Sequence, residues 1–280
     1  MPHPILYDTH MHTPLCKHAT GTPGDYAAYA EKRGLKGIII TCHNPGPDAS
    51  FSNRVRMNPD QFDEYVQLVE EARQIWHGRI DIRLGLECDF LPEMIPFLEE
   101  LLSRAKFHHV LGSIHPQLPY YRQKYDNGRP REFFATYYDL LAQAAESNLF
   151  DTLSHPDLVK NSHPNYWQLD DDLMTVIRHS LDRIAAVGTA MELNTSGLNK
   201  RVREMNPAPT ILREMQQRNI PVVIGSDAHE PGRVAADFET ALHLLADCGY
   251  THTSIFLNRQ RREIAIDQAL NSLKGSEMGN

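Results

Sequence analysis

Cysteine is scarce in this chain and is not arranged as a redox or metal-binding motif. The 280 residues include four widely spaced cysteines, Cys16, Cys42, Cys88 and Cys248, and none of them belongs to a Cys-x-x-Cys pair. A disulfide framework or a thiolate zinc site needs clustered cysteines at defined spacings, so the sequence predicts neither. We interpret all four as free thiols in a reducing compartment.

Signals for export and for membrane insertion are also lacking. The first ten residues, MPHPILYDTH, contain neither a basic segment nor an apolar run of the kind found in secretory signals. No apolar run in the chain is long enough to span a bilayer. Lysine and arginine (28) are outnumbered by aspartate and glutamate (36), which gives a net charge of -8 and disfavours a nucleic-acid partner. We therefore expect a cytoplasmic protein that acts on a small molecule.

No internal repeat, low-complexity tract or long linker divides the chain. The composition, 41% hydrophobic and 23% charged, is typical of globular proteins. A single α/β barrel commonly has this length, and its core can be large enough to need no disulfide. We predict one domain that spans residues 1–280.

Short β-rich runs alternate with helical patterns along the whole chain. Several runs, such as GIIIT and PVVIG, are continuously apolar, as is typical of parallel strands covered on both faces. The predicted strands are 5–8, 37–42, 82–86, 109–113, 150–154, 190–194 and 222–226. The segment 252–258 is a possible eighth strand, and its place in the sheet is left open.

The intervening segments have recognisable helix ends. Thr22 and Pro23 begin one helix and Gly34 follows it, while Asn58, Pro59 and Gly78 mark another in the same way. Further helices are predicted at 93–105, 131–147, 172–188, 209–219 and 234–249. Irregular loops are predicted at 44–58, 116–130, 160–169 and 196–209. Repeated strand-then-helix units with right-handed connections close most easily into a barrel.

Polar residues with metal-binding chemistry follow nearly every predicted strand. In chain order they are Asp8, His10, His12, His43, Glu87, His115, His155, Glu192, Asn194, Asp227 and His229. In a barrel the carboxyl ends of all strands face the same mouth, where barrel enzymes keep their active sites. A single such histidine is usually structural, but so many desolvated polar groups need a partner, and metal ions are the natural one.

Ligand chemistry narrows the choice of metal. Imidazole and carboxylate groups without an obligatory thiolate suit Zn²⁺, Mn²⁺ or Fe²⁺. With His18, the candidate ligands exceed what one tetrahedral ion can use, so we predict two or three divalent ions that share a carboxylate. Clustered cations lower the pKa of a bridging water and neutralise the oxygens of a transferring phosphoryl group.

Six motifs in order resemble the polymerase and histidinol phosphatase (PHP) superfamily. They are DTHMH, TCH, GLE, GSIH, SHPD and GSDAH, and the resemblance runs from about Tyr7 to Phe256. The longer patterns HTPLCKHATG, LFDTLSHPDLVK and ELNTSGLNK are similar to the histidinol-phosphatase branch. The resemblance implies a single distorted (β/α)7 TIM-like barrel with a trinuclear metal centre.

The resemblance also implies a ligand set. The first ion is assigned His10, His12, Glu87 and Asp227. The second is assigned Glu87 as a bridge, with His115 and His155. The third is assigned His18, His43 and His229. Asp8 is expected to orient a ligand histidine, and we expect Asp8, Glu87, Asp227 and His229 to carry catalysis.

The expected reaction is hydrolysis of a phosphate monoester, most simply L-histidinol phosphate in histidine biosynthesis. Lys160, Lys200 and Arg201 are candidate phosphate contacts, and solvated loop charges are the competing interpretation. Glu192 and Asn194 are candidate substrate contacts, and Asp89 or Asp126 could also meet a cationic substrate. The group that protonates the leaving alcohol is not assigned: His229 and a metal-bound water are both candidates.

Three departures from the family pattern concern the surroundings of the ligands. Cys42 stands where relatives often have an acidic residue, Asn199 follows the SGL motif, and Pro116 follows His115. Two alternatives follow: a phosphoesterase for nucleotides or nucleic-acid ends, and a metal-stabilised binding module without turnover. The complete ligand set argues against the second alternative.

Overall fold

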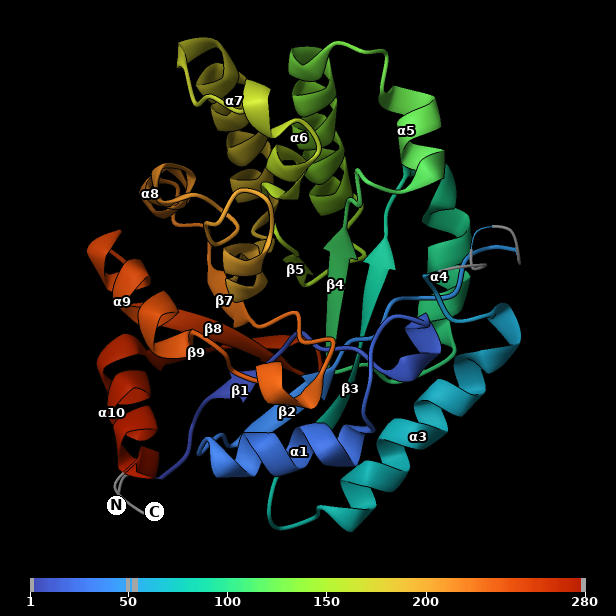
Figure 1. Cartoon of the computed structure of the whole chain (residues 1–280), viewed down its shortest axis with the longest axis vertical. Helices are drawn as coiled ribbons and strands as arrows, with labels where there is room; N and C mark the ends of the chain where they lie inside the picture. The colour runs from blue at the N-terminus through green and yellow to red at the C-terminus, as the bar shows by residue number, and fades with distance from the viewer. Residues whose placement is uncertain (1–2, 49–50, 52–54, 278–280) are drawn as a thin grey trace.

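The computed structural model describes residues 3–48, 51 and 55–277 and shows a sheet enclosed by helices (Figure 1). The strands pair in chain order, in parallel from β1 to β8, and β9 is antiparallel to β8. Their bounds are β1 Tyr7–Asp8, β2 Gly37–Ile40, β3 Asp81–Asp89, β4 His109–Ser113, β5 Thr152–Leu153, β6 Ala190–Asn194, β7 Val222–Gly225, β8 His252–Leu257 and β9 Gln260–Ala265.

Helices follow the parallel strands and cover the sheet from outside. They are α1 Pro23–Lys32, α3 Phe62–Ile75, α4 Ile95–Ser103, α5 Pro119–Tyr125, α6 Pro130–Glu146, α7 Asp171–Val187, α8 Pro209–Gln217, α9 Phe238–Asp247 and α10 Ile266–Glu277. The predicted start of α1 is confirmed, because Thr22 caps the helix that begins at Pro23 and forms a reciprocal capping box with Asp25. None of these helices, within the described part of the chain, is long and apolar enough to cross a membrane.

The seven predicted strands correspond to β1–β7. No ladder joins β9 back to β1 in the described residues, but the segments that follow β1 and β7 meet. A parallel bridge links Met11 to Ala228, with hydrogen bonds from the His12 amide to the Ala228 carbonyl (2.9 Å) and from the Ala228 amide to the His10 carbonyl (3.2 Å). This bridge brings the first and last strand ends together at one mouth.

Four elements differ from the sequence prediction or add to it. The possible eighth strand exists as β8, but it forms a hairpin with β9 and pairs with β7 only through Ser254 and Val223. The predicted loop 116–130 contains the short helix α5, and β9 and α10 were not predicted. In β9 the exposed sequence QRRE lacks the apolar pattern of a buried strand, because only its partner β8 lies inside.

Candidate metal centre

The polar residues predicted at the strand ends converge at the carboxyl-terminal mouth of the sheet. Asp8 lies on β1, Glu87 on β3, and Glu192 and Asn194 on β6. The others lie on the segments that follow their strands. Most of these side chains are buried, whereas His18 is exposed and His229 is half-buried. Five groups of potential ligand atoms within 4.8 Å of one another occur among the described residues: His12/Cys16/His229, His18/His43/His229, His10/His12/Asp227, His12/His43/Glu87 and Glu87/His115/His155.

Glu87 is the hub of this mouth. Its Oε1 lies 3.0 Å from His155 Nε2 and 3.5 Å from His115 Nε2. Its Oε2 lies 2.6 Å from His43 Nδ1 and 3.4 Å from His10 Nε2. The Ser113 hydroxyl, which was not predicted, donates to Oε1 at 2.6 Å and fixes the carboxylate. A single buried carboxylate thus faces imidazoles from four different strand ends, as a bridging ligand would.

Asp227 forms the opposite side of the mouth. Its Oδ1 lies 3.1 Å from His12 Nε2 and 3.6 Å from His10 Nε2. Its Oδ2 accepts a hydrogen bond from the Ser196 hydroxyl (3.0 Å) and faces Lys200 Nζ at 3.5 Å. Its backbone φ of 51° is in the left-handed region, a conformation that aspartate adopts more readily than most residues. Asp227 therefore connects the buried imidazoles to the open part of the mouth.

His18, His43 and His229 lie at the outer side. The Nε2 atoms of His18 and His229 are 3.0 Å apart, and the rings of His18 and His43 stack with centroids 5.3 Å apart. His18 reaches this place although it lies in the loop after the short helix Pro14–Cys16, eight residues beyond His10. Two imidazole nitrogens that face each other at this distance can share a cation or a single proton.

Several buried atoms at the mouth lack a hydrogen bond within the described residues. They are His10 Nε2, His12 Nδ1, His43 Nδ1, His155 Nδ1 and Glu87 Oε2. His43 Nδ1 and Glu87 Oε2 lie 2.6 Å apart without a hydrogen bond between them. Burial of such atoms without a partner is costly, and a cation among them removes the cost. The donor set therefore fits divalent metal ions.

The electrostatics agree with this donor set. Although burial acts most strongly to raise it, the imidazoles of His43, His10 and His115 hold the pKa of Glu87 well below its usual range. The pKa of Asp227 is also lowered well below its usual range, because Lys200 and His10 outweigh its burial. Burial, helped by His12, lowers the pKa of His229 to about 3. Both carboxylates are thus ionised and His229 is neutral, which are the forms that bind metal.

Two of the imidazoles are held by carboxylates through Nδ1, the ring nitrogen that does not face Glu87. Glu192 Oε1 lies 2.7 Å from His10 Nδ1, and Asp89 Oδ1 lies 2.6 Å from His115 Nδ1. Arg56, which was not predicted, donates to both oxygens of Asp89 and is itself buried. Asp89 was named only as a candidate contact for a cationic substrate, and its place two positions after Glu87 on the same strand face could have indicated that it lies beside the ligands. Nothing in the sequence links Arg56 to it.

Glu192 and Asn194 were predicted to touch substrate, but both side chains are fully buried below the mouth. Glu192 Oε2 accepts from the His155 amide (2.9 Å) and from Asn194 Nδ2 (2.9 Å). The His155 backbone has a φ of 31°, in the left-handed region, and its amide is the one bound to Glu192. A Cβ on Gly225 would lie 2.0 Å from Glu192 Oε1, which explains the glycine. Glu192 is placed to orient His10 and His155.

Asp8 also differs in detail from its expected role. It accepts hydrogen bonds from the Ser226 amide and hydroxyl, the Ala235 amide (2.7 Å) and the His10 amide (3.3 Å). It therefore braces backbone around the mouth and bonds to no imidazole ring among the described residues.

The three predicted basic contacts lie in different places. Lys160 is fully buried, and its ammonium binds Asp157 Oδ2 (3.0 Å), the Met205 carbonyl (2.9 Å) and Glu204 (3.4 Å). Lys200 lines a cavity of about 390 Å³ together with His18, His43, His115, Asp227 and His229. Arg201 lines an adjoining cavity of about 600 Å³ that shares Lys200. The structure thus brings Lys200 to the mouth and leaves Lys160 out of it.

The fold and this site define a barrel protein whose mouth binds divalent metal ions. The profile of the PHP domain family matches residues 8–196, and the chain belongs to this family. A relative from Deinococcus radiodurans, named a probable histidinol-phosphatase, is 40% identical over 253 residues, which cover 87% of this chain and 94% of the relative. The histidinol-phosphatase of Bacillus subtilis is 25% identical to this chain, and the match covers 84% of this chain and 97% of the Bacillus protein.

A solved structure shares the fold. The histidinol phosphate phosphatase of Lactococcus lactis, solved with zinc, L-histidinol and phosphate, superposes with a TM-score of 0.74 at 18% identity. The match covers 91% of this chain and 98% of the other. The predicted barrel fold and the predicted membership of the histidinol-phosphatase branch are confirmed.

Proposed function

We propose that this protein is a histidinol-phosphatase, a metal-dependent hydrolase that releases phosphate from L-histidinol phosphate. The observation that carries the proposal is the 40% identity to a probable histidinol-phosphatase over nearly the full length of both chains. The mouth supports the chemistry, because it gathers imidazoles and two carboxylates around a cavity of about 390 Å³. That volume is of the size that small-molecule sites have.

Two or three divalent ions, zinc, manganese or iron, would be held at this mouth. His10, His12, Glu87 and Asp227 are proposed for the first, Glu87, His115 and His155 for the second, and His18, His43 and His229 for the third. When bound, such ions lower the pKa of a water molecule and neutralise phosphate oxygens. The groups of ligand atoms within 4.8 Å of one another support this division.

The remaining residues of the mouth orient the substrate and the ligands. Lys200 lies 3.5 Å from Asp227 and lines the cavity, so its ammonium is placed to meet an anionic phosphate. Glu192 and Asp89 hold the outer nitrogens of His10 and His115, which directs the inner nitrogens into the mouth. Arg56 balances the charge of Asp89 and leaves that carboxylate fixed on His115.

A comparison of substrates tests the proposal. Phosphate release is measured for L-histidinol phosphate, for nucleoside monophosphates and for 5′-phosphorylated oligonucleotides, at matched concentration and with zinc or manganese added. We expect kcat/KM for L-histidinol phosphate to exceed the others by on the order of a hundredfold, because a site shaped for one leaving group leaves polar groups unpaired with another. A preference for nucleotides would overturn the substrate and leave the metal chemistry in place.

A further inference from the structure

Two buried serines lie against the carboxylate of Glu87. Ser113 is the last residue of β4, and Ser154 directly follows β5. The Ser154 amide donates to the Gly112 carbonyl (3.0 Å), which continues the pairing of these two strands by one residue. Both serine side chains are fully buried. The ends of two neighbouring strands thus place two hydroxyls at the same point of the mouth.

The hydrogen bonds of these hydroxyls have a definite direction. Ser113 Oγ lies 2.6 Å from Glu87 Oε1, whereas Ser154 Oγ lies 3.4 Å from the same oxygen. The two hydroxyl oxygens are also in hydrogen-bond contact with each other. Each hydroxyl has one hydrogen, and an ionised carboxylate only accepts, so the shorter contact takes the hydrogen of Ser113. The contact between the serines then takes the hydrogen of Ser154, and the chain runs from Ser154 through Ser113 to Glu87.

This chain of hydroxyls gives the two oxygens of Glu87 different surroundings. Oε1 accepts from Ser113 and also faces His155 Nε2 at 3.0 Å and His115 Nε2 at 3.5 Å. Oε2 has no hydrogen bond among the described residues and faces other imidazoles, of which His43 Nδ1 is the nearest at 2.6 Å. The last torsion of a glutamate side chain has no sharp minimum, so the side chain alone does not fix this division.

We propose that Ser113, held by Ser154, is a positioning residue that makes Glu87 serve two ions through separate oxygens. The hydroxyl fixes the rotation of the carboxylate, so that Oε1 is kept for the group of ligands that includes His155. Oε2 is kept for the group that includes His43. Neither serine binds an ion itself. This role deepens the proposed function and rests on it.

The test compares zinc affinity in Ser113→Ala and Ser113→Thr with the unaltered protein, by competition with a chelating dye. Loss of a group that orients a ligand typically lowers metal affinity about 10- to 100-fold, and we expect this loss for Ser113→Ala. Ser113→Thr keeps the hydroxyl and should recover a substantial part of it. Ser154→Ala keeps the direct hydrogen bond to Glu87 and should lose less. Ser180→Ala is the matched control, since Ser180 is a buried serine on the outer helix α7.

Zinc affinity of Ser113→Ala within twofold of the unaltered protein would overturn the inference, even if the melting temperature fell, because the serines would then only fill the core. If Ser113→Ala does not fold, a crystal structure of the zinc-loaded unaltered protein decides. We expect one Glu87 oxygen on each of two ions, with Ser113 on Oε1. Both oxygens on one ion, or a serine hydroxyl as a ligand, would contradict the inference. Normal zinc binding without phosphate release from L-histidinol phosphate would instead refute the proposed function alone.

Discussion

Two groups of buried charged side chains lie after the strands of this sheet, and they differ in how their charge is balanced. In the first, Lys160 and Asp157 face each other at 3.0 Å, and both are fully buried. In the second, Glu87 and Asp227 face a cluster of imidazoles whose inner nitrogens partly lack hydrogen bonds. Lys160 and Asp157 balance each other's charge, whereas the charges of Glu87 and Asp227 are balanced by Lys200 and by whatever the imidazoles take up, protons or metal ions.

The comparison teaches that burial of charge does not by itself indicate function. Lys160 and Asp157 hold the segment around residues 204–208, because Asp157 also accepts from the Ala208 amide (2.8 Å) and Lys160 donates to the Met205 carbonyl. Glu87 holds no such segment, and its contacts are mainly to imidazoles from other strand ends. Substitutions in the two groups should therefore have opposite consequences.

The largest effect is expected for Glu87→Gln. The amide cannot bridge two cations, so we expect zinc content to fall below one equivalent and kcat/KM to fall by about a thousandfold or more. Metal analysis of the purified variant and phosphate release measure this. The melting temperature of the chelator-treated variant is the control and should match that of the chelator-treated parent or exceed it. Full metal content with normal turnover would remove Glu87 from the centre.

Lys160→Met should instead reduce stability. An unpaired Asp157 carboxylate would remain buried, which typically costs about 3–5 kcal/mol. Urea unfolding at neutral pH measures this loss, and zinc affinity should stay unchanged. The double variant Lys160→Met/Asp157→Asn removes both charges and should recover part of the stability. A Lys160→Met variant of normal stability but poor affinity for substrate would restore the original prediction of a phosphate contact.

His18→Ala should deplete one ion and leave the others. His18 is exposed and lies at the outer side of the mouth, where its Nε2 is 3.0 Å from His229 Nε2. We expect the loss of about one metal equivalent and a drop in kcat of about 10- to 100-fold, without a change in fold. Metal analysis together with circular dichroism checks both. Unchanged metal content would make His18 a loop residue only.

The smallest effect is expected for Lys200→Ala. Its side chain is 29% exposed, so its attraction for phosphate is screened by solvent. We expect KM to rise by about three- to tenfold with little change in kcat, as for a residue that contributes uniform binding. Arg201→Ala is the control, because Arg201 lines only the adjoining cavity and should change KM less. Equal effects of both variants would indicate that general surface charge attracts the substrate.

The sequence predicted the barrel strands well where apolar runs were continuous, as in β2 and β7, and it also gave the bounds of β4 and β6. It made β1 and β5 too long, since only two residues of each belong to a strand and the predicted residues before them lie outside it. The hairpin strand β9 is exposed and charged, so no buried pattern marked it. The helix α5 was predicted as a loop for a similar reason, because only one of its residues is buried and no apolar stripe marks it.

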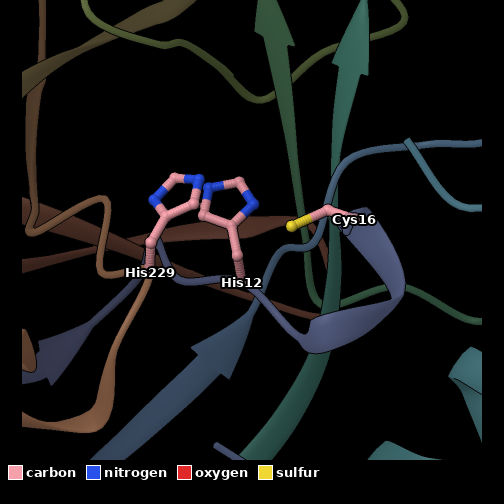
Figure 2. A group of neighbouring side chains, drawn as sticks. All are labelled: His12, Cys16 and His229. Carbon is pink, nitrogen blue, oxygen red and sulfur yellow. The ribbon is translucent and has the colours of Figure 1, made fainter. Parts of the chain in front are cut away.

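The ligand candidates were found because a strand end determines on which side of a barrel a residue lies. The direction of a long or second-layer side chain is not determined in this way. Lys160 folds back to Asp157, and Glu192 points below the mouth to His10. Arg56 comes from a loop 33 residues before Asp89, and no spacing connects them. Cys16 was interpreted only as a free thiol, and its sulfur points toward His12 (Figure 2).

Metal stoichiometry is the most direct test of the account. The protein is purified without chelator, its zinc, manganese and iron are determined by elemental analysis, and the same sample is assayed for phosphate release from L-histidinol phosphate. We predict two to three equivalents of divalent transition metal per chain, with activity lost on removal of the metal and restored on its return. A folded, stable and active protein that holds no metal would contradict the account.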